Sequence, residues 1–150
     1  MRLTRDSSPG YMTNWAARLF ARELERQLRP SGIMPAYMPV IFALSDGGAL
    51  TQKALARIAV IEQPTMAATL NRMERDGFIT RRPDPGDGRS ALIALTPFGL
   101  ERIGVVEKVV QSINALAFAP LEPEERAQFM GLIGKIITAL DAQDQQAPSS

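Results

Sequence analysis

The chain has 150 residues, of which 45% are apolar, and a formal net charge of +1, as expected for one globular domain or two small ones. It contains no Cys and no His, which excludes disulfides, thiol chemistry, His-dependent catalytic triads and the usual zinc sites. No apolar run approaches the roughly 20 residues that span a bilayer, so we expect a cytoplasmic protein with no membrane partner.

The remaining chemistry also argues against an enzyme. No pair of acidic residues lies in an apolar stretch that would tune it for catalysis, and we expect neither a cofactor nor a metal. Charge is distributed unevenly, because residues 51–95 carry seven basic and five acidic side chains, whereas residues 96–150 carry four and seven. The acidic excess lies in the C-terminal part, which leaves the central part better suited to a polyanion such as DNA.

The N-terminal part predicts a flexible arm over residues 1–12, followed by one amphipathic helix. From Thr13 to about Leu28, apolar residues recur at the spacing of one helix face. The members of this stripe are Trp15, Ala16, Leu19, Phe20, Leu24 and Leu28. Ser31 and Gly32 end the element, so residues 13–34 form one structural segment.

A second helix is predicted to begin at Pro35 and to continue to about Ser45. It is apolar nearly all round, which indicates a central, buried position. Pro39 lies one turn into this helix, where its missing N–H removes one hydrogen bond and favours a bend.

Residues 50–76 predict two helices joined by a tight turn, which is a helix-turn-helix. Thr51 is a suitable N-cap for the first helix. The first helix is expected to bury Leu55, Ile58 and Ala59. The second helix is expected to run from about Gln63 or Pro64 to Asp76 and to stop at Gly77. Its buried face is formed by Met66, Leu70, Met73 and, after the helix ends, Phe78.

The opposite face of the second helix carries short or polar side chains, which suits a helix in the major groove of DNA. Small residues allow close approach, while Gln, Thr and Arg offer donors and acceptors to base edges and phosphates. The candidates are Gln63, Thr65, Ala68, Thr69 and Arg72. Taken alone, this pattern is equally typical of a solvated helix face.

Two short strands around the segment PDPGDG predict a β-hairpin directly after the second helix of the helix-turn-helix, the recognition helix. A hairpin at this place is the wing of a winged helix. Arg89 beside the tip is a candidate for the minor groove. Asp87 is expected mainly to hold the tip in shape. Of Arg81 and Arg82, we expect one to contact phosphate and the other to pair with a nearby acid.

Residues 97–142 predict two further helices. Thr96 and Pro97 are typical of an N-cap and a first helical residue, and the first of these helices is expected to end near Phe118. The last helix begins near Pro123, and residues 143–150 are expected to form a flexible tail. These helices carry more apolar surface than a small winged helix covers, which predicts a homodimer with two-fold symmetry.

Residues 50–96 resemble the MarR family of bacterial transcription factors. The matching stretches are LTQKALAR, QPTMAATLNRMERDGFI and RRPDPGDGRS followed by LT. Two departures are Val60, where helix-turn-helix proteins often have Gly, and Glu62, where a Ser cap is usual. The resemblance implies a mainly α fold with a small β-hairpin wing, in which a winged helix-turn-helix over residues 35–96 joins a helical dimerisation region over residues 13–34 and 97–142.

The resemblance also implies a sequence-specific regulator, more often a repressor, that binds double-stranded DNA with a pseudo-palindromic operator as a homodimer. In that family the wing-tip Asp and Arg, here Asp87 and Arg89, order the wing and reach DNA. The DNA-binding residues that we expect are Gln63, Thr65, Ala68, Thr69, Arg72, Arg82, Asp87 and Arg89.

Similar proteins are often released from DNA by a small aromatic or phenolic effector. Here Tyr11, Trp15, Arg18, Tyr37 and Met38 are candidates for lining such a pocket, although aromatic residues that pack a core explain the same pattern. The alternative function is a winged-helix module that binds protein without specific DNA binding.

Overall fold

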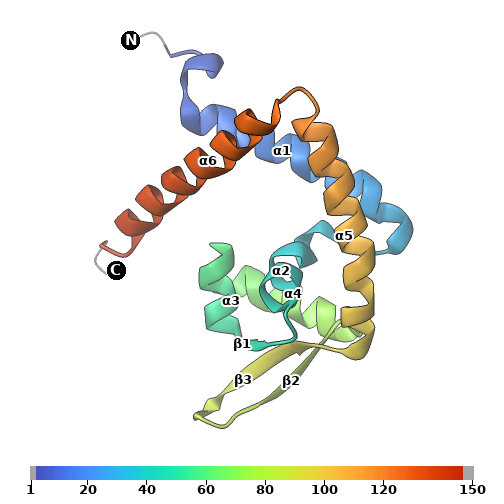
Figure 1. Ribbon diagram of the computed structural model, residues 1–150. Helices are drawn as coiled ribbons and strands as arrows, with labels where there is room; N and C mark the ends of the chain where they lie inside the picture. The colour runs from blue at the N-terminus through green and yellow to red at the C-terminus, as the bar shows by residue number, and fades with distance from the viewer. Residues whose placement is uncertain (1–2, 147–150) are drawn as a thin grey trace. The chain divides into compact units, whose positions relative to one another are not determined.

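A computed structural model describes residues 3–146, and these form two compact units, which are divided between Ile113 and Asn114. Figure 1 shows the elements in chain order. The helices are α1 (Pro9–Leu28), α2 (Met38–Leu44), α3 (Gln52–Ala59), α4 (Gln63–Arg75), α5 (Pro97–Phe118) and α6 (Pro123–Asp144), and the strands are β1 (Ala49–Thr51), β2 (Ile79–Asp84) and β3 (Asp87–Leu95). The predicted fold class, mainly α with a small β wing, is confirmed.

Helix α1 begins at Pro9, four residues before the Thr13 that the apolar stripe predicted. The Ser8 hydroxyl caps the helix by accepting a hydrogen bond from the backbone N–H of Tyr11 at 3.3 Å. Pro9 then occupies the first turn, where its fixed φ favours a helix and no N–H is needed. The predicted arm is therefore helical from Pro9 onward, and residues 1–2 of it, like residues 147–150 of the predicted tail, lie outside the described residues.

The second predicted helix is divided into two parts. Pro35–Tyr37 form a 3₁₀ turn, and α2 follows from Met38 to Leu44. Because the α-helix starts only at Met38, Pro39 lies in its first turn rather than one turn in, and the predicted reason for a bend disappears. Although Phe42 is 62% exposed, five buried side chains agree with the predicted central position. These are Tyr37, Met38, Val40, Ile41 and Leu44.

The helix-turn-helix is confirmed, with one wrong assignment. The Thr51 hydroxyl caps α3 by accepting from the N–H of Ala54 at 3.2 Å, as predicted. Ile58, however, is 56% exposed, and Ala56 is buried in its place. Val60 ends the helix with φ of 53°, a left-handed conformation that is costly for a β-branched residue and explains why Gly is usual there.

Helix α4 has the buried face that the sequence predicted, formed by Met66, Leu70 and Met73. The helix ends at Arg75, and Gly77 supplies the left-handed residue that turns the chain into β2, with φ of 82°. Glu62 stands at the N-cap without a side-chain capping bond.

The hairpin of β2 and β3 is extended by a strand that the sequence did not predict. Strand β1 has three residues, too few for a visible alternation, and pairs antiparallel with β3 so that Ala49 lies opposite Ala94. The sheet order is β1-β3-β2. The strand before the helix-turn-helix thus anchors the base of the wing.

The junction between β2 and α5 is tightly packed around Phe78. The Phe78 carbonyl accepts a hydrogen bond from the N–H of Thr96 at 2.9 Å, and the Thr96 hydroxyl caps α5 by accepting from the N–H of Gly99 at 3.1 Å. A Cβ atom on Gly99 would overlap the Phe78 carbonyl oxygen. The Phe78 ring makes edge-to-face contacts with Tyr37 and Phe98, at centroid distances of 5.4 and 5.3 Å.

The second unit contains the end of α5 and the whole of α6. A capping box starts α6, in which the Glu122 N–H donates to the Glu125 carboxylate at 2.8 Å. The Phe118 and Phe129 rings pack edge-to-face, 5.8 Å apart. Helix α6 has no buried residue, although it is rich in large apolar side chains. Among the described residues, no helix is long and apolar enough to cross a membrane.

We predict that Gly99→Ala lowers the free energy of unfolding by about 2 kcal/mol or more, because the added methyl group forces the start of α5 away from Phe78. Gly104→Ala on the same helix is the matched control, since nothing lies within 4 Å of its Cβ position. There the better helix propensity of Ala is expected to raise stability by about 0.5–1 kcal/mol. Urea denaturation of both variants measures these changes, and equal effects would contradict the predicted overlap.

Candidate nucleic-acid interface

The exposed face of α4 forms a narrow sector of short and polar side chains. At about 100° per residue, Thr65, Ala68, Thr69 and Arg72 fall within roughly 100° of one another around the helix axis. Thr69 is half-buried and the other three are exposed. Gln63 is exposed at the first helical position but lies outside this sector, so it can reach a ligand only from the end of the helix.

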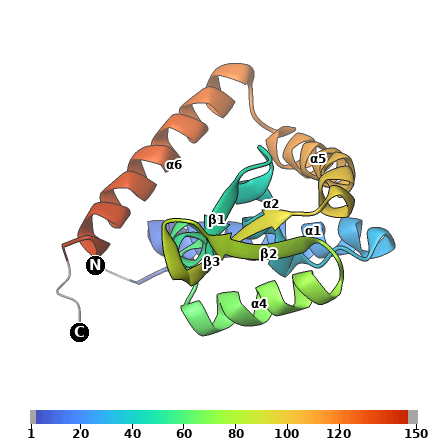
Figure 2. The same cartoon turned by 90° about the horizontal axis from the view of Figure 1, so that it is seen from below.

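The wing hairpin lies alongside α4, and Figure 2 shows the two elements on the same side of the first unit. Arg81 holds them together. Its guanidinium donates to the side-chain oxygen of Asn71 at 2.9 Å and lies 3.6 Å from the Glu74 carboxylate. The prediction that one of the two adjacent arginines pairs with an acid is therefore confirmed for Arg81.

Arg82 has the opposite orientation, because successive side chains of a strand point to opposite faces. It is exposed, and within residues 3–146 it makes neither an ion pair nor a side-chain hydrogen bond. A phosphate contact by Arg82 remains a prediction.

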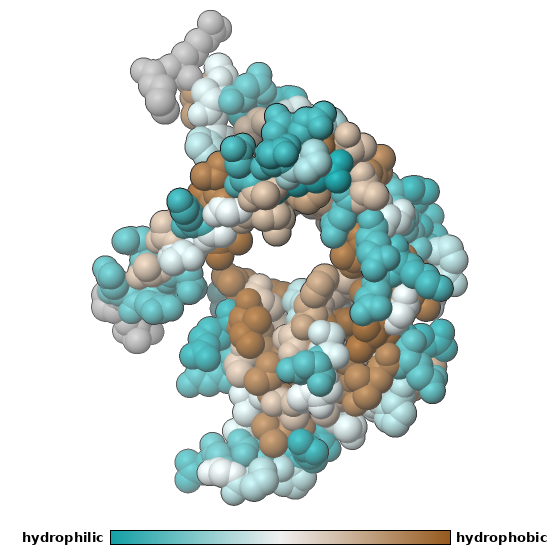
Figure 3. Space-filling model, viewed as in Figure 1, coloured by the Kyte–Doolittle hydropathy of each residue, from teal (hydrophilic) through white to brown (hydrophobic). Residues whose placement is uncertain are grey.

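The tip of the wing is ordered by two carboxylates. Asp84 accepts a hydrogen bond from the N–H of Gly86 at 2.9 Å, and Asp87 accepts from the N–H of Arg89 at 3.0 Å. Asp87 also accepts from the Ser90 hydroxyl at 3.4 Å. The geometry agrees with the shape-holding role that we expected for Asp87, and it leaves the exposed Arg89 side chain without an ion pair among the described residues. Figure 3 shows the hydrophilic surface over this tip.

A buried tyrosine, which the sequence offered both as an effector-pocket candidate and as a core residue, packs in the core and contacts the end of α4. Tyr37 is fully buried, and its hydroxyl donates to the carboxylate of Asp76, the C-cap of α4, at 2.5 Å. Burial and the Asp76 carboxylate raise the pKa of Tyr37 to about 12. The same hydrogen bond lowers the pKa of Asp76. No local pattern reveals this contact, because 39 positions separate the two residues.

The other pocket candidates do not form one group. Met38 belongs to the core with 6% exposure, whereas Tyr11 and Trp15 lie on α1 and are 46% and 36% exposed. Trp15 packs under the guanidinium of Arg5, which lies 4.0 Å from its ring centre.

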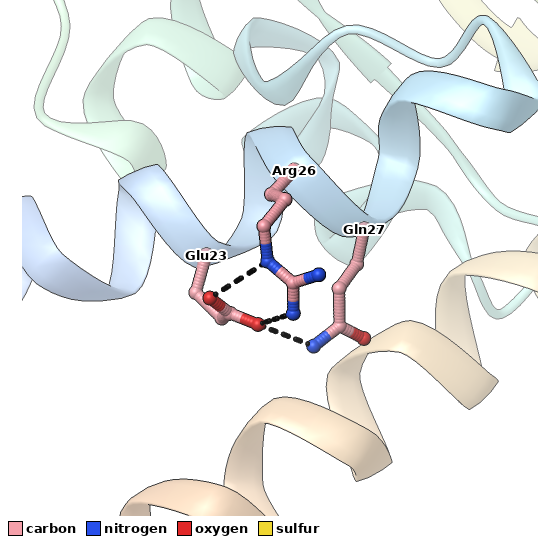
Figure 4. Close-up of polar contacts among 3 residues, drawn as sticks. All are labelled: Glu23, Arg26 and Gln27. Atoms are coloured by element: carbon pink, nitrogen blue, oxygen red, sulfur yellow. Dashed lines mark hydrogen bonds and ion pairs between the residues drawn. The ribbon is translucent and has the colours of Figure 1, made fainter.

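A cluster of polar side chains on α1 is distant in sequence from α4 and the wing. Glu23 accepts hydrogen bonds from the Arg26 guanidinium and from the Gln27 amide, the latter at 2.9 Å (Figure 4). These bonds, Arg26 first, lower the pKa of Glu23 to about 2. The cluster supports α1 through pairs at the i,i+3 and i,i+4 spacings. Among the described residues, no group of three or more acidic side chains is placed to hold a metal ion.

Comparison with known proteins identifies the family. A MarR family model matches residues 31–90. The uncharacterized HTH-type transcriptional regulator YwoH of Bacillus subtilis (strain 168) is 34% identical over 122 residues, which cover 81% of this chain and 88% of that protein. The chain belongs to the MarR family. Members of this family are transcriptional regulators rather than enzymes.

Solved MarR-type structures share the fold. The PcaV transcriptional regulator of Streptomyces coelicolor, in complex with its natural ligand, has a TM-score of 0.80 and 24% identity, covering 93% of this chain and 99% of that one. The transcriptional repressor CouR, bound to a 23-mer DNA duplex, also has a TM-score of 0.80, with 21% identity, and covers 91% of this chain and 99% of that one. Both comparisons support the winged-helix architecture described above.

We predict that Tyr37→Phe lowers the free energy of unfolding at pH 7 by about 1 kcal/mol, because it removes the bond to Asp76 and keeps the ring. The pKa of Asp76 is lowered in the folded state, so this stabilisation is present above the unfolded pKa of about 3.9 and is lost as the pH falls further. Urea denaturation at pH 7 and pH 3 measures the difference between wild type and variant. The difference should shrink at pH 3, and an equal difference at both values would contradict the assignment.

Proposed function

We propose that this MarR-family chain is a sequence-specific DNA-binding transcriptional regulator that acts as a homodimer on a pseudo-palindromic operator. The observation that carries the proposal is the sector of Thr65, Ala68, Thr69 and Arg72 beside a wing whose Arg89 makes no ion pair among the described residues. Small side chains on α4 allow close approach to base edges, and a wing arginine suits the negative potential of the minor groove. DNA bound to the similar CouR supports this use of the fold.

Arg82, Gln63 and Asp87 have different roles in this proposal. Arg82 contacts phosphate, and Gln63 contacts DNA from the N-terminal end of α4. Asp87 acts through the wing, because it accepts the N–H of Arg89 and a carboxylate near phosphate would be repelled. Because the similar CouR is a transcriptional repressor, we propose that this chain also represses transcription.

The proposed dimer rests on large apolar side chains that the single chain leaves exposed. In the first unit they lie on α1 and include Leu19 and Phe20, at 43% and 39% exposure. In the second unit, four of them form one stripe of α6, at i, i+3, i+7 and i+11. The members of this stripe are Phe129, Leu132, Ile136 and Leu140, each at least 45% exposed. A two-fold dimer over residues 13–34 and 97–142 would place two recognition helices about one DNA turn apart.

We also propose a small-molecule effector, for which the ligand-bound PcaV structure is the precedent. In the first unit, an open cavity of about 320 Å³ lies between α2 and α5, with Ile41, Phe42 and Val106 among its apolar walls. Its polar lining consists of Ser45, Glu107 and Gln111, and no basic residue is among the described residues that line it. This lining favours a neutral phenol over the aromatic carboxylate that an arginine would bind.

We predict that the protein binds DNA from its own upstream region more tightly than scrambled DNA, and that Arg89→Ala weakens specific binding about ten-fold or more. Arg5→Ala is the matched control, because it removes the same charge from an exposed position outside both the candidate interface and the proposed dimer segments. Fluorescence anisotropy at two salt concentrations measures both effects. Binding that ignores DNA sequence and salt would instead support the protein-interaction module.

We predict that the protein has twice the mass of one chain in solution and that Leu132→Glu shifts it toward the monomer, because a charge in an apolar interface is costly. Gln128→Glu introduces the same charge at an exposed polar position of α6 and should leave the dimer intact. Size-exclusion chromatography with light scattering measures both masses. A wild-type monomer at micromolar concentration would contradict the proposed dimer.

A further inference from the structure

Met34 lies against Arg72, the arginine in the exposed sector of α4. The guanidinium of Arg72 approaches the Met34 sulfur at 3.3 Å. Met34 follows the buried Ile33, and its carbonyl accepts from the Tyr37 N–H at 2.9 Å, so its backbone is held at the start of the 3₁₀ turn. A thioether is only a weak acceptor, so the present contact leaves the guanidinium available for DNA.

Met34 also differs in its surroundings from the other methionines within residues 3–146. Met38, Met66 and Met73 are at most 6% exposed and belong to the core, where an oxidant has little access. Met12 and Met130 are 43% and 57% exposed, but they lie on α1 and α6, which carry the proposed dimer surface. Met34 is 38% exposed and lies outside both helices, at the last position of the segment 13–34, where its sulfur faces Arg72 of α4. Because the chain has no Cys, no thiol competes with it for an oxidant.

We propose that Met34 is an oxidation-sensitive modification site whose sulfoxide binds Arg72 and weakens DNA binding. The oxidant is a peroxide. Hydrogen peroxide transfers one oxygen atom to the sulfur, so that an S–O bond forms and the O–O bond breaks. The sulfur loses two electrons, and the second peroxide oxygen leaves as water with both protons. Sulfoxide reductases reverse this modification at the expense of a thiol reductant.

The modification changes the hydrogen bonding of Arg72. A sulfoxide oxygen is a strong acceptor, and a bond to a charged donor is worth more than one between neutral groups. Arg72 would then have to give up this bond before it could contact a base or a phosphate. The inference rests on the proposed function, because it requires that the Arg72 side chain contacts DNA.

The experiment compares DNA binding before and after mild hydrogen peroxide treatment, with peptide mass spectrometry to locate the sulfoxide. We expect wild type to lose about five-fold or more in specific affinity and to recover it after methionine sulfoxide reductase treatment. Met34→Leu should bind DNA as well as reduced wild type and should keep its affinity after treatment. Met12→Leu, the matched control, should lose affinity as wild type does.

A second pair of variants tests the mechanism without an oxidant. Met34→Gln places a strong acceptor near Arg72 and should weaken binding relative to Met34→Leu, whereas in an Arg72→Ala background the two should bind equally. An equal peroxide effect on wild type and Met34→Leu would overturn the proposal, as would oxidised Met34 with unchanged affinity. If reduced wild type binds no DNA, the proposed function itself fails and the inference falls with it.

Discussion

The backbone at Phe78 is the point on which the rest of the winged helix depends. Its carbonyl accepts from Thr96 and lies so close to Gly99 that no side chain fits at that position. This contact joins the residue after Gly77, where the chain leaves α4, to the residues that begin α5. Because close-packed interiors transmit displacements rather than absorb them, the end of α4, the base of the wing and the start of α5 keep a fixed relation within the first unit.

Polar contacts also hold the C-terminal part of α4 in place. Tyr37 reaches Asp76 from the turn before α2, and Arg81 reaches back from β2 to Asn71 and Glu74. The helix is therefore held from two sides by side chains that are distant in sequence. These bonds involve Asn71 and Glu74 of α4 and its C-cap, Asp76. Among the described residues, Arg82 and Arg89 of the wing make no ion pair.

Local signals predicted much of this architecture, since they depend on neighbours in sequence. Thr51 caps its helix where an N-cap was expected, and the spacing of Met66, Leu70 and Met73 gave the buried face of α4. The signals failed where an element was short or a contact was long-range. An eight-residue helix is too short to fix its phase, so Ile58 was assigned to the wrong side.

The candidate site likewise combines features that local sequence signals predict with long-range contacts that they do not. The α4 sector follows from helical spacing, and the order of the wing tip follows from Asp and Gly residues in a turn. By contrast, the bond between Tyr37 and Asp76 and the contact between Met34 and Arg72 join residues 39 and 38 positions apart. No periodicity carries such information, because only the folded chain brings those residues together.

Helix α4 has a buried face and an exposed face, and this separation bears on how regulators of this type diverge. Met66, Leu70 and Met73 are fully or almost fully buried, whereas Thr65, Ala68 and Arg72 contribute little to the core. Under the proposed function, substitutions on the outer face would change recognition at little cost in folding, so that a gene duplicate would acquire a new target without first passing through an unstable intermediate.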